Sequence, residues 1–375
     1  MPATAARPAL ADVDFASTPF IVIWEMTQAC QLACLHCRAS ARPFPDPAEL
    51  STDEAMRLLD AIRAMGRPLV VLTGGDPLER PDVVRIVEYG TSIGLRVALT
   101  PSGTPLMTEA VLTELRDAGL ARLAVSLDGS TAVIHDRFRG VDGSYNWTLR
   151  MLAAARTMGL TTQINTTISR HNRDDLEAMI RLLGGLGIAL WSVFFIVPTG
   201  RARPSDLTTP AEHEAVFHRL YDLSRAAPFD IKTTAAPHYR RVVLERQIAE
   251  RRAGSRAAPP SPLTAGIGFS LADGLGRAKS VNDGNGFVFV SHRGDIYPSG
   301  FLPVSAGNVR TDSLAEVYRD SPIFRALRDP DRLKGKCGAC EYRTVCGGSR
   351  ARAYAVTGDY LAPDPSCSYV PARLR

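Results

Sequence analysis

Six short apolar segments, separated by stretches typical of helices, constrain the fold of this 375-residue chain more than any other feature. They lie at residues 20–26, 69–75, 96–103, 122–129, 161–169 and 190–198. Stretches such as DEAMRLLDAIRAMG and EAVLTELRDAG lie between them. This alternation predicts βα units and an α/β fold with a parallel sheet. Six units predict a partial (β/α)6 barrel of the TIM type rather than the closed barrel of eight.

Polar residues gather directly after these apolar segments. They lie at residues 30–37, 73–76, 102–104, 126–129, 165 and 200–201. The carboxyl ends of the strands of such a barrel form one mouth, and barrel enzymes carry their active sites there. We therefore expect these polar groups to form one site.

The pattern changes after the last apolar segment, which predicts a division of the chain. We expect an N-terminal tail over 1–18, the barrel over 19–235, a linker and lid over 236–286, and a small cysteine-rich domain over 287–375. FVFVSHRGDIYPSG predicts a hairpin that turns at residues 292–295. A helix is expected around residues 312–328.

Composition excludes several classes of protein. The net charge of +5 is spread over 44 basic and 39 acidic residues, so no nucleic-acid partner is expected. No apolar run approaches the roughly eighteen residues of a membrane span, and the first twenty residues lack the apolar core of a secretion signal. We expect a cytoplasmic protein without a membrane partner. Its thiols would stay reduced, and clustered cysteines would be metal ligands.

The first cysteine cluster has three members, Cys30, Cys34 and Cys37, spaced C-x3-C-x2-C. A structural zinc site takes four protein ligands. Three thiolates can instead hold three irons of a four-iron cluster and leave the fourth iron open to another ligand. His36 is poorly spaced to complete a zinc site with its neighbours. The set therefore favours a cluster with one open position.

The second cysteine set is Cys337, Cys340, Cys346 and Cys367, spaced C-x2-C-x5-C-x20-C. Four thiolates can close a site completely, around either zinc or an iron–sulfur cluster. The spacing alone leaves both possibilities open.

The C-x3-C-x2-C motif after the first apolar segment resembles the signature of the radical S-adenosylmethionine (SAM) superfamily. The resemblance implies a 4Fe-4S cluster at Cys30, Cys34 and Cys37 that binds SAM and cleaves it reductively to a 5′-deoxyadenosyl radical. This radical then abstracts hydrogen from a substrate. The resemblance also implies an electron donor such as a flavodoxin or ferredoxin.

The same resemblance assigns the residues that contact SAM. His36 would lie near the adenine of SAM. The family's G-G-E motif corresponds here to Thr73, Gly74, Gly75 and Asp76, so the acidic side chain is one methylene shorter than the family's glutamate. The remaining candidates are Ser126 and Asp128 for the SAM carboxylate and ribose, Arg139 after them, and Ile196 and Val197 beside the adenine. As isolated apolar residues of a strand, Ile196 and Val197 are better explained as core residues than as adenine contacts.

The segment CGACEYRTVCGGSRARAYAVTGDYLAPDPSC resembles the C-terminal SPASM extension of radical SAM enzymes, which houses auxiliary clusters. Full SPASM domains carry more cysteines, and this chain has Ser299 and Ser349 where two of them are expected. The resemblance therefore implies one auxiliary 4Fe-4S cluster, held by the second cysteine set.

WEMTQACQLACLHCRA, LTGGDPLERPD and YPSGFLPVSAGNVR most resemble the heme-synthesis branch of this superfamily. The resemblance implies oxidative decarboxylation or another side-chain modification of a tetrapyrrole such as iron-coproporphyrin III. Two alternatives stay open: a maturase of a ribosomally synthesised peptide, and a non-catalytic iron–sulfur electron carrier. For an acidic tetrapyrrole, Arg240 is the candidate carboxylate ligand, and His238 is either an axial iron ligand or an ordinary surface histidine.

Overall fold

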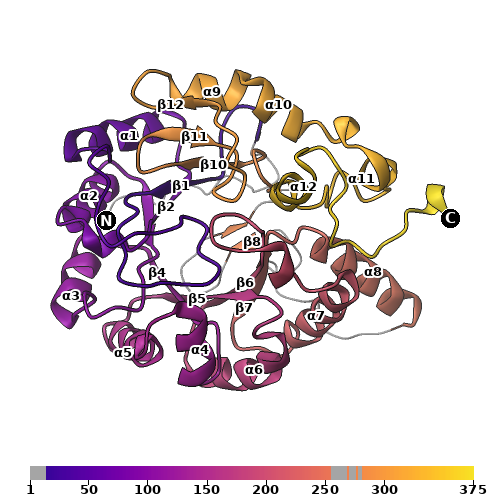
Figure 1. The fold of residues 1–375 in the computed structure, drawn as a ribbon, viewed down its shortest axis with the longest axis horizontal. Coiled ribbons are helices and arrows are strands. Elements are labelled where there is room, and N and C mark those ends of the chain that lie inside the picture. Colours follow the sequence, from indigo (N-terminus) through magenta and orange to yellow (C-terminus); the bar gives the residue numbers. More distant parts are fainter. Residues whose placement is uncertain (1–13, 255–267, 270–275, 278–280) are drawn as a thin grey trace.

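The computed structural model describes residues 14–254, 268–269, 276–277 and 281–375. Its centre is one curved sheet of ten strands, surrounded by helices (Figure 1). The strand order is β12-β11-β10-β1-β2-β3-β4-β5-β6-β7. Seven neighbouring strands run parallel: β1 (Ile21–Glu25), β2 (Leu69–Thr73), β3 (Arg96–Leu99), β4 (Arg122–Ser126), β5 (Thr162–Ile168), β6 (Leu190–Phe195) and β7 (Asp230–Thr234). The predicted α/β fold with a partial barrel is confirmed.

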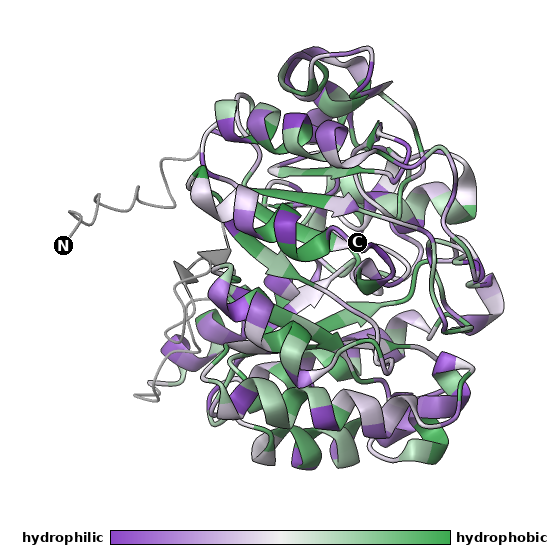
Figure 2. Ribbon diagram, turned by 90° about the vertical axis from the view of Figure 1, so that its left-hand side faces the viewer, coloured by the Kyte–Doolittle hydropathy of each residue, from purple (hydrophilic) through white to green (hydrophobic). Residues whose placement is uncertain are grey.

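Helices cover the outside of this sheet (Figure 1). They are α1 (Thr52–Ala64), α2 (Val83–Ser92), α3 (Glu109–Asp117), α4 (Ala132–Arg139), α5 (Ser144–Thr157), α6 (Leu176–Gly185), α7 (Pro210–Leu223) and α8 (Tyr239–Arg252). Apolar residues concentrate on the strands and on the helix faces that meet them, as the hydropathy colours of Figure 2 show. Burial of these apolar faces is the main force that holds the helices against the sheet.

Local sequence signals explain where the helices begin. Ser51 and Glu54 form a capping box at the start of α1, and each side chain binds the backbone of the other. Thr209 and Glu212 repeat this arrangement at α7, where Pro210 occupies the first turn. These caps satisfy backbone N–H groups that a helix start leaves without partners.

The seventh parallel strand, β7, was not among the six predicted strands. It pairs with β6 at the edge of the sheet. Its sequence DIKTT has a single strongly apolar residue, Ile231, so it lacks the run of apolar residues that identified the other six. The barrel therefore contains one βα unit more than the sequence predicted.

The hairpin predicted near residues 292–295 is confirmed, and it continues the barrel's sheet. Strand β10 (Phe287–Val290) runs parallel to β1, with Val22 opposite Val288. Strand β11 (Asp295–Tyr297) returns antiparallel, and β12 (Gly307–Asn308) follows it. The start of the predicted cysteine-rich domain is thus joined to the barrel through backbone hydrogen bonds.

The helix expected around 312–328 is two helices, α9 (Leu314–Asp320) and α10 (Pro322–Arg328). The break falls at Ser321, because Pro322 has no N–H to continue the first helix. The short helices α11 (Gly335–Ala339) and α12 (Arg350–Thr357) follow in the cysteine-rich segment.

Helix α12 lies at the open side of the barrel, between the two ends of the sheet (Figure 1). Its Arg352 is fully buried and donates to the carbonyl oxygen of Ala235, just after β7. Its Ala351 packs with Val197, after β6, and with Leu302, after β11. The C-terminal segment therefore joins the two ends of the open sheet.

The predicted linker and lid falls partly outside the described residues. Its described part contains α8 and the antiparallel pair β8 (Gly268–Phe269) and β9 (Gly276–Arg277). Among the described residues, no helix is long and apolar enough to cross a membrane.

Candidate active site

The three N-terminal cysteines lie in the loop that follows β1, which we call the cysteine loop (residues 30–37). Cys30 and Cys34 are buried and Cys37 is half-buried. The backbone N–H of Leu32 donates to Cys30 Sγ at 3.3 Å, and the N–H of Ala41 donates to Cys37 Sγ at 3.4 Å. Donors aimed at sulfur stabilise the thiolate form that an iron–sulfur cluster requires.

Without such a cluster, burial raises the pKa of Cys30 to about 11. Its Sγ lies 3.4 Å from the Ser102 hydroxyl, after β3, and Ser102 donates to the carbonyl oxygen of Gly75 at 3.0 Å. A buried thiol with a raised pKa needs a cation to become a thiolate, and a bound metal supplies one.

Helix α4 contacts the loop from another side. Arg139, at its C-terminus, donates to Cys34 Sγ at 3.7 Å and forms an ion pair with the buried Asp128. The predicted SAM ligands Asp128 and Arg139 are thus neighbours, and Arg139 reaches a cluster cysteine as well. Asp128 also accepts from the backbone N–H of Thr167 at 2.6 Å, which fixes its carboxylate at the ends of β4 and β5.

His36 stacks on Phe138, with ring centroids 4.2 Å apart and planes 14° from parallel. Burial, together with the charges of Arg139 and Arg201, holds the pKa of His36 well below its usual value. The ring is therefore neutral, and its second face is not covered by Phe138.

Gly200 and Arg201, in the loop after β6, hold the cysteine loop from the third side. Arg201 donates to the carbonyl oxygens of Cys34 (2.9 Å) and Ala41 (3.1 Å). Gly200 has a φ of +61°, and a Cβ there would lie 2.3 Å from the carbonyl oxygen of Cys37. No residue with a side chain fits this position without displacing the loop.

The glycine motif after β2 packs against the residues that directly precede the cysteine loop. A Cβ on Gly75 would lie 2.2 Å from the carbonyl oxygen of Ala29, and one on Gly74 would lie 2.7 Å from that of Thr27. The backbone N–H of Asp76 donates to Ala29 at 2.7 Å. Thr73 ends β2 directly before this motif.

The side chain of Asp76 is buried and turned toward β3. It accepts hydrogen bonds from Thr104 Oγ1 (2.8 Å) and from the backbone N–H groups of Ser102 (3.3 Å) and Leu78 (3.1 Å). Burial raises its pKa to about 6. The Asp76 carboxylate thus holds the loop after β2 in place, and the backbone of Gly74 and Gly75 remains available for a ligand at the barrel mouth.

Ser126, Ile196 and Val197 complete the predicted SAM contacts. Ser126 ends β4 and lies beside Asn165 of β5 in the sheet register. Ile196 and Val197 follow β6 and are buried, with Val197 in the cluster that joins α12 to the barrel. The structure therefore favours a core role for Val197.

Several buried nitrogens near the cysteine loop have no hydrogen-bond partner within the described residues: His36 Nδ1, Arg139 Nε and Arg201 Nη2. Buried donors without partners are costly, so their concentration here indicates a polar ligand. Sulfur-directed donors, a glycine-lined backbone and these nitrogens together fit a 4Fe-4S cluster with bound SAM. Sequence reasoning had placed Ser102 and Arg201 only within the polar clusters that follow the strands.

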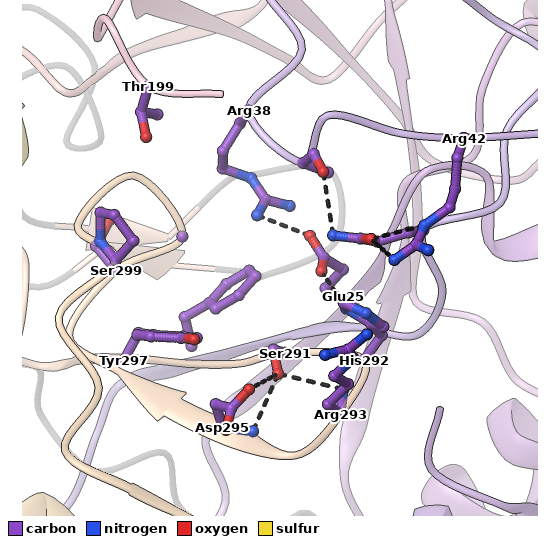
Figure 3. Close-up of a pocket in the computed structure, with 15 residues that line it drawn as sticks. Glu25, Arg38, Arg42, Thr199, Ser291, His292, Arg293, Asp295, Tyr297 and Ser299 are labelled. Carbon is purple, nitrogen blue, oxygen red and sulfur yellow. Dashed lines mark hydrogen bonds and ion pairs between the residues drawn. The ribbon is translucent and has the colours of Figure 1, made fainter. Parts of the chain in front are cut away.

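A second feature of the mouth is a cavity of ≈ 330 Å³, which we call the hairpin pocket (Figure 3). Its lining comes from residues 25–28, 38–42, 199 and 289–303. Glu25, at the end of β1, is buried between Arg38 Nη1 (2.8 Å) and His292 Nδ1 (2.8 Å). Burial alone would raise the pKa of Glu25, but Arg38 and His292 outweigh it and lower that pKa.

The predicted substrate ligands His238 and Arg240 do not line this pocket. Arg240 is buried and donates to the carbonyl oxygens of Val345 (3.0 Å) and Val281. It also lies beside Cys346. A guanidinium so enclosed is not available to a substrate carboxylate, so the geometry contradicts this prediction and favours a role at the second cysteine set.

His238 is fully buried, which excludes the alternative of an ordinary surface histidine. Its ring lies edge-on to Phe217, with centroids 4.6 Å apart, and its Nδ1 is 3.8 Å from Asp364 Oδ2. Burial holds its pKa well below the usual value. It therefore lies between the barrel and the cysteine-rich segment rather than in a lid.

The four C-terminal cysteines have their own set of donors. Cys337 Sγ accepts from the backbone N–H of Asp364 (3.4 Å) and from Arg350 Nη2 (3.7 Å), and Cys346 Sγ accepts from Gly348 N (3.4 Å). Burial, and then the nearby thiols of Cys367 and Cys337, raise the pKa of Cys346. This pattern repeats that of the cysteine loop.

In the described part of the chain, no three His, Cys, Asp or Glu side chains are arranged to hold a single metal ion. Four thiolates can bind either one zinc ion or a four-iron cluster, so the identity of the group at the second cysteine set stays a prediction.

Comparison with known proteins identifies the family. Residues 24–183 match the family model described as the Radical SAM superfamily. The chain is 42% identical to the AdoMet-dependent heme synthase of Methanosarcina barkeri over 95% of its length and 98% of that protein. It is 39% identical to the AdoMet-dependent heme synthase of Oleidesulfovibrio alaskensis, over 94% and 88% of the two chains.

Relatives named as peptide maturases match at about 30% identity. The structure superposes on that of Streptococcus suis SuiB bound to S-adenosylmethionine with a TM-score of 0.69, at 16% identity, over 94% of this chain and 78% of that one. That likeness shows the shared fold. With the cysteine loop and the family match, these findings establish that the chain is an enzyme of the radical SAM superfamily.

Proposed function

We propose that this radical SAM enzyme acts on iron-coproporphyrin III and converts two of its propionate side chains to the vinyl groups of heme. The observation that carries the proposal is the full-length match to a protein named AdoMet-dependent heme synthase, at 42% identity. The peptide maturases match less closely, at about 30%. Membership of an enzyme superfamily also speaks against a non-catalytic electron carrier.

When bound, the cluster and SAM supply the 5′-deoxyadenosyl radical that removes hydrogen from substrate. Cys30, Cys34 and Cys37 would hold three irons, and the backbone of Gly74 and Gly75 would face the SAM amino group. For each propionate, the change to a vinyl group releases one hydrogen atom, one carbon dioxide and one electron. The hydrogen atom leaves the side-chain carbon next to the ring, and the carbon–carbon bond to the carboxylate then breaks.

The electron released in each step needs an acceptor. The four C-terminal cysteines would hold one auxiliary 4Fe-4S cluster that can take it. Full cysteine ligation leaves no open iron for substrate, which suits electron transfer better than substrate binding. A small electron carrier such as a flavodoxin or ferredoxin would reduce the first cluster.

The test is anaerobic reconstitution with iron and sulfide, followed by incubation with SAM, dithionite and iron-coproporphyrin III. We expect heme, with about two 5′-deoxyadenosines per heme, as measured by mass spectrometry. A Cys30→Ala, Cys34→Ala, Cys37→Ala variant should form neither product. Failure of the reconstituted protein to convert the porphyrin, together with modification of a peptide encoded near its gene, would reject the proposal in favour of a maturase.

A further inference from the structure

The hairpin pocket adjoins the cysteine loop. Its wall continues directly from the cluster ligand Cys37 to Arg38, and the β10–β11 hairpin closes the opposite side (Figure 3). The volume of ≈ 330 Å³ lies at the lower end of the range for ligand pockets. It is enough for one edge of a tetrapyrrole with its side chain, not for the whole macrocycle.

The pocket is lined by charged side chains of both signs. Three guanidinium groups line it, from Arg38, Arg42 and Arg293, together with the carboxylates of Glu25 and Asp295. Arg42 and Arg293 share a third carboxylate behind the wall, that of Asp46.

Like Asp46, Asp295 lies close enough to Arg293 to raise the pKa of that arginine. It is held within the hairpin by the Ser291 hydroxyl (3.0 Å) and the Asn308 amide (3.0 Å). Three arginines therefore meet three carboxylates, those of Glu25, Asp46 and Asp295, so an anion can bind only where a guanidinium is not fully engaged by its carboxylate.

Arg38 lines the pocket, and only part of its guanidinium group is bound by a carboxylate of the protein. One nitrogen, Nη1, forms an ion pair with Glu25 Oε2 at 2.8 Å. The other oxygen of Glu25 binds His292 at 2.8 Å. Glu25 therefore cannot take both branches of the guanidinium fork.

The plane of Arg38 is set by an aromatic wall. Its guanidinium lies 4.6 Å from the centroid of the Phe289 ring, and Tyr297 lies beside Phe289 on the neighbouring strand, with ring centroids 6.3 Å apart. Stacking on an aromatic ring orients a guanidinium while leaving its edge free for a carboxylate. Phe289 is buried, whereas the partly exposed ring of Tyr297 offers an apolar surface to a flat conjugated substrate.

We propose that the hairpin pocket binds a propionate carboxylate of the substrate, and that Arg38 is the residue that holds it; this inference rests on the proposed function. A carboxylate in the plane of the guanidinium would accept two N–H bonds, which is the strong bidentate geometry. Glu25 and His292 act as positioning residues that orient Arg38. Because Arg38 directly follows Cys37, the anchored edge of the substrate lies beside the cluster.

Arg38→Gln tests this assignment by anaerobic titration with iron-coproporphyrin III, followed through the Soret band. Loss of a charge-assisted bidentate contact should weaken binding about tenfold or more. The uncharged tetramethyl ester of the same porphyrin is the second probe. It should bind the variant and the wild type equally, because it carries no carboxylate for Arg38 to hold.

Arg219→Gln is the matched control. Arg219 is an exposed arginine on α7 that pairs with Glu177 on α6, so this change removes the same charge at a site away from the pocket. It should bind the porphyrin as the wild type does. If Arg38→Gln does not fold, Arg38→Lys decides, since it keeps the charge and loses the fork; it should bind the acid more weakly and the ester normally.

The outcomes separate the two proposals. Wild-type binding of the acid with an unchanged affinity in both Arg38 variants would overturn the assignment and leave the proposed function standing. Equal weakening of acid and ester would overturn it too, because it would indicate a structural role. No binding of the acid by the wild type would overturn the proposed function, and this subsite with it.

Discussion

Gly200 supports the cysteine loop through both its backbone conformation and its close contact with that loop. Its φ of +61° is a left-handed conformation that side chains disfavour, and its Cα faces the carbonyl oxygens of Cys37 and Arg38. The adjacent Arg201 binds the same loop through Cys34 and Ala41. This pair of residues shapes the cysteine loop although neither carries a ligand.

Gly200→Ala should therefore lower both stability and iron content. The conformation alone costs about 1 kcal/mol, and the clash with two carbonyl oxygens adds to it. Gly159→Ala is the control: Gly159 has a φ of +70°, but a Cβ there would meet nothing within 4 Å. Melting temperature and iron per chain measure both effects. Equal losses in the two variants would show that the loop tolerates the added methyl group.

Asp76 predicts a pH dependence of stability. Its folded-state pKa of about 6 lies above the ordinary value of 3.8, so the folded chain binds this proton more tightly than the unfolded chain does. The corresponding stability is present below about pH 4 and is lost as the pH rises through about 6. At pH 7.5 the buried charge is thus a cost to the fold.

Asp76→Asn removes that charge and keeps an oxygen for the backbone donors. It should raise stability at pH 7.5 by about 1–3 kcal/mol and change it little at pH 4.5. Asp82→Asn should act in the opposite direction, because Asp82 pairs with Arg80 and its pKa is lowered. Thermal unfolding at the two pH values measures both. Destabilisation by Asp76→Asn at pH 7.5 would contradict the assigned cause.

Residues close together in a motif were predictable, whereas residues brought together from distant segments were not. The spacing of Cys30, Cys34 and Cys37 predicts a cluster site because the three cysteines share one loop. The hairpin pocket joins Glu25, Arg38 and His292 across more than 250 positions, and no local pattern marks such a site. Arg240 was misassigned for the complementary reason: its sequence neighbourhood does not reveal that the C-terminal segment covers it.

At the scale of elements, apolar content decided which strands could be predicted. The six predicted strands were found because their sequences are runs of apolar and β-branched residues. Strand β7 escaped because it lies at the edge and is largely polar. The turn and pairing of β10 and β11 could be predicted as a hairpin, but its partner β1 could not, since parallel pairing across more than 260 residues leaves no trace in local sequence.

Helix α12 is held to the barrel by a buried charge. Arg352 and Asp364 are both fully buried, with Nε and Oδ1 3.4 Å apart, and Arg352 also donates to Ala235 after β7. Removing one member of such a pair leaves the other charge buried and without compensation. The docking of this element should therefore depend on Arg352 far more than on its surface ion pairs.

Arg352→Met should destabilise the protein by about 3–5 kcal/mol. Lys334→Met should cost less than about 1 kcal/mol, because the pair that it removes with Asp359 is largely exposed. Anaerobic thermal unfolding compares the two variants. Similar small losses in both would show that α12 docks through its apolar contacts alone.

For the molecule as a whole, the sheet and the cysteines divide the chain at different places. The cysteine-rich segment was predicted to begin at 287, yet strands β10–β12 belong to the barrel's sheet, and α9 and α10 follow directly from them. The C-terminal cysteine ligands all lie beyond residue 336. We therefore expect the independent folding unit to extend about to the end of α10.

Two truncations test this division. A chain of residues 1–254 loses β10, which leaves one edge of the buried strand β1 without a partner and uncovers core residues such as Val22 and Trp24. It should be insoluble, since an exposed apolar strand edge pairs with other chains. A chain of residues 1–329 keeps β10–β12, α9 and α10 and loses α11, α12 and the second cysteine set. It should stay soluble, melt at a lower temperature than the full chain because the contacts of α12 are gone, and bind about half the iron of the full chain after reconstitution. Size-exclusion chromatography and iron analysis distinguish the two, and a soluble, iron-binding 1–254 chain would show that the hairpin is dispensable to the barrel.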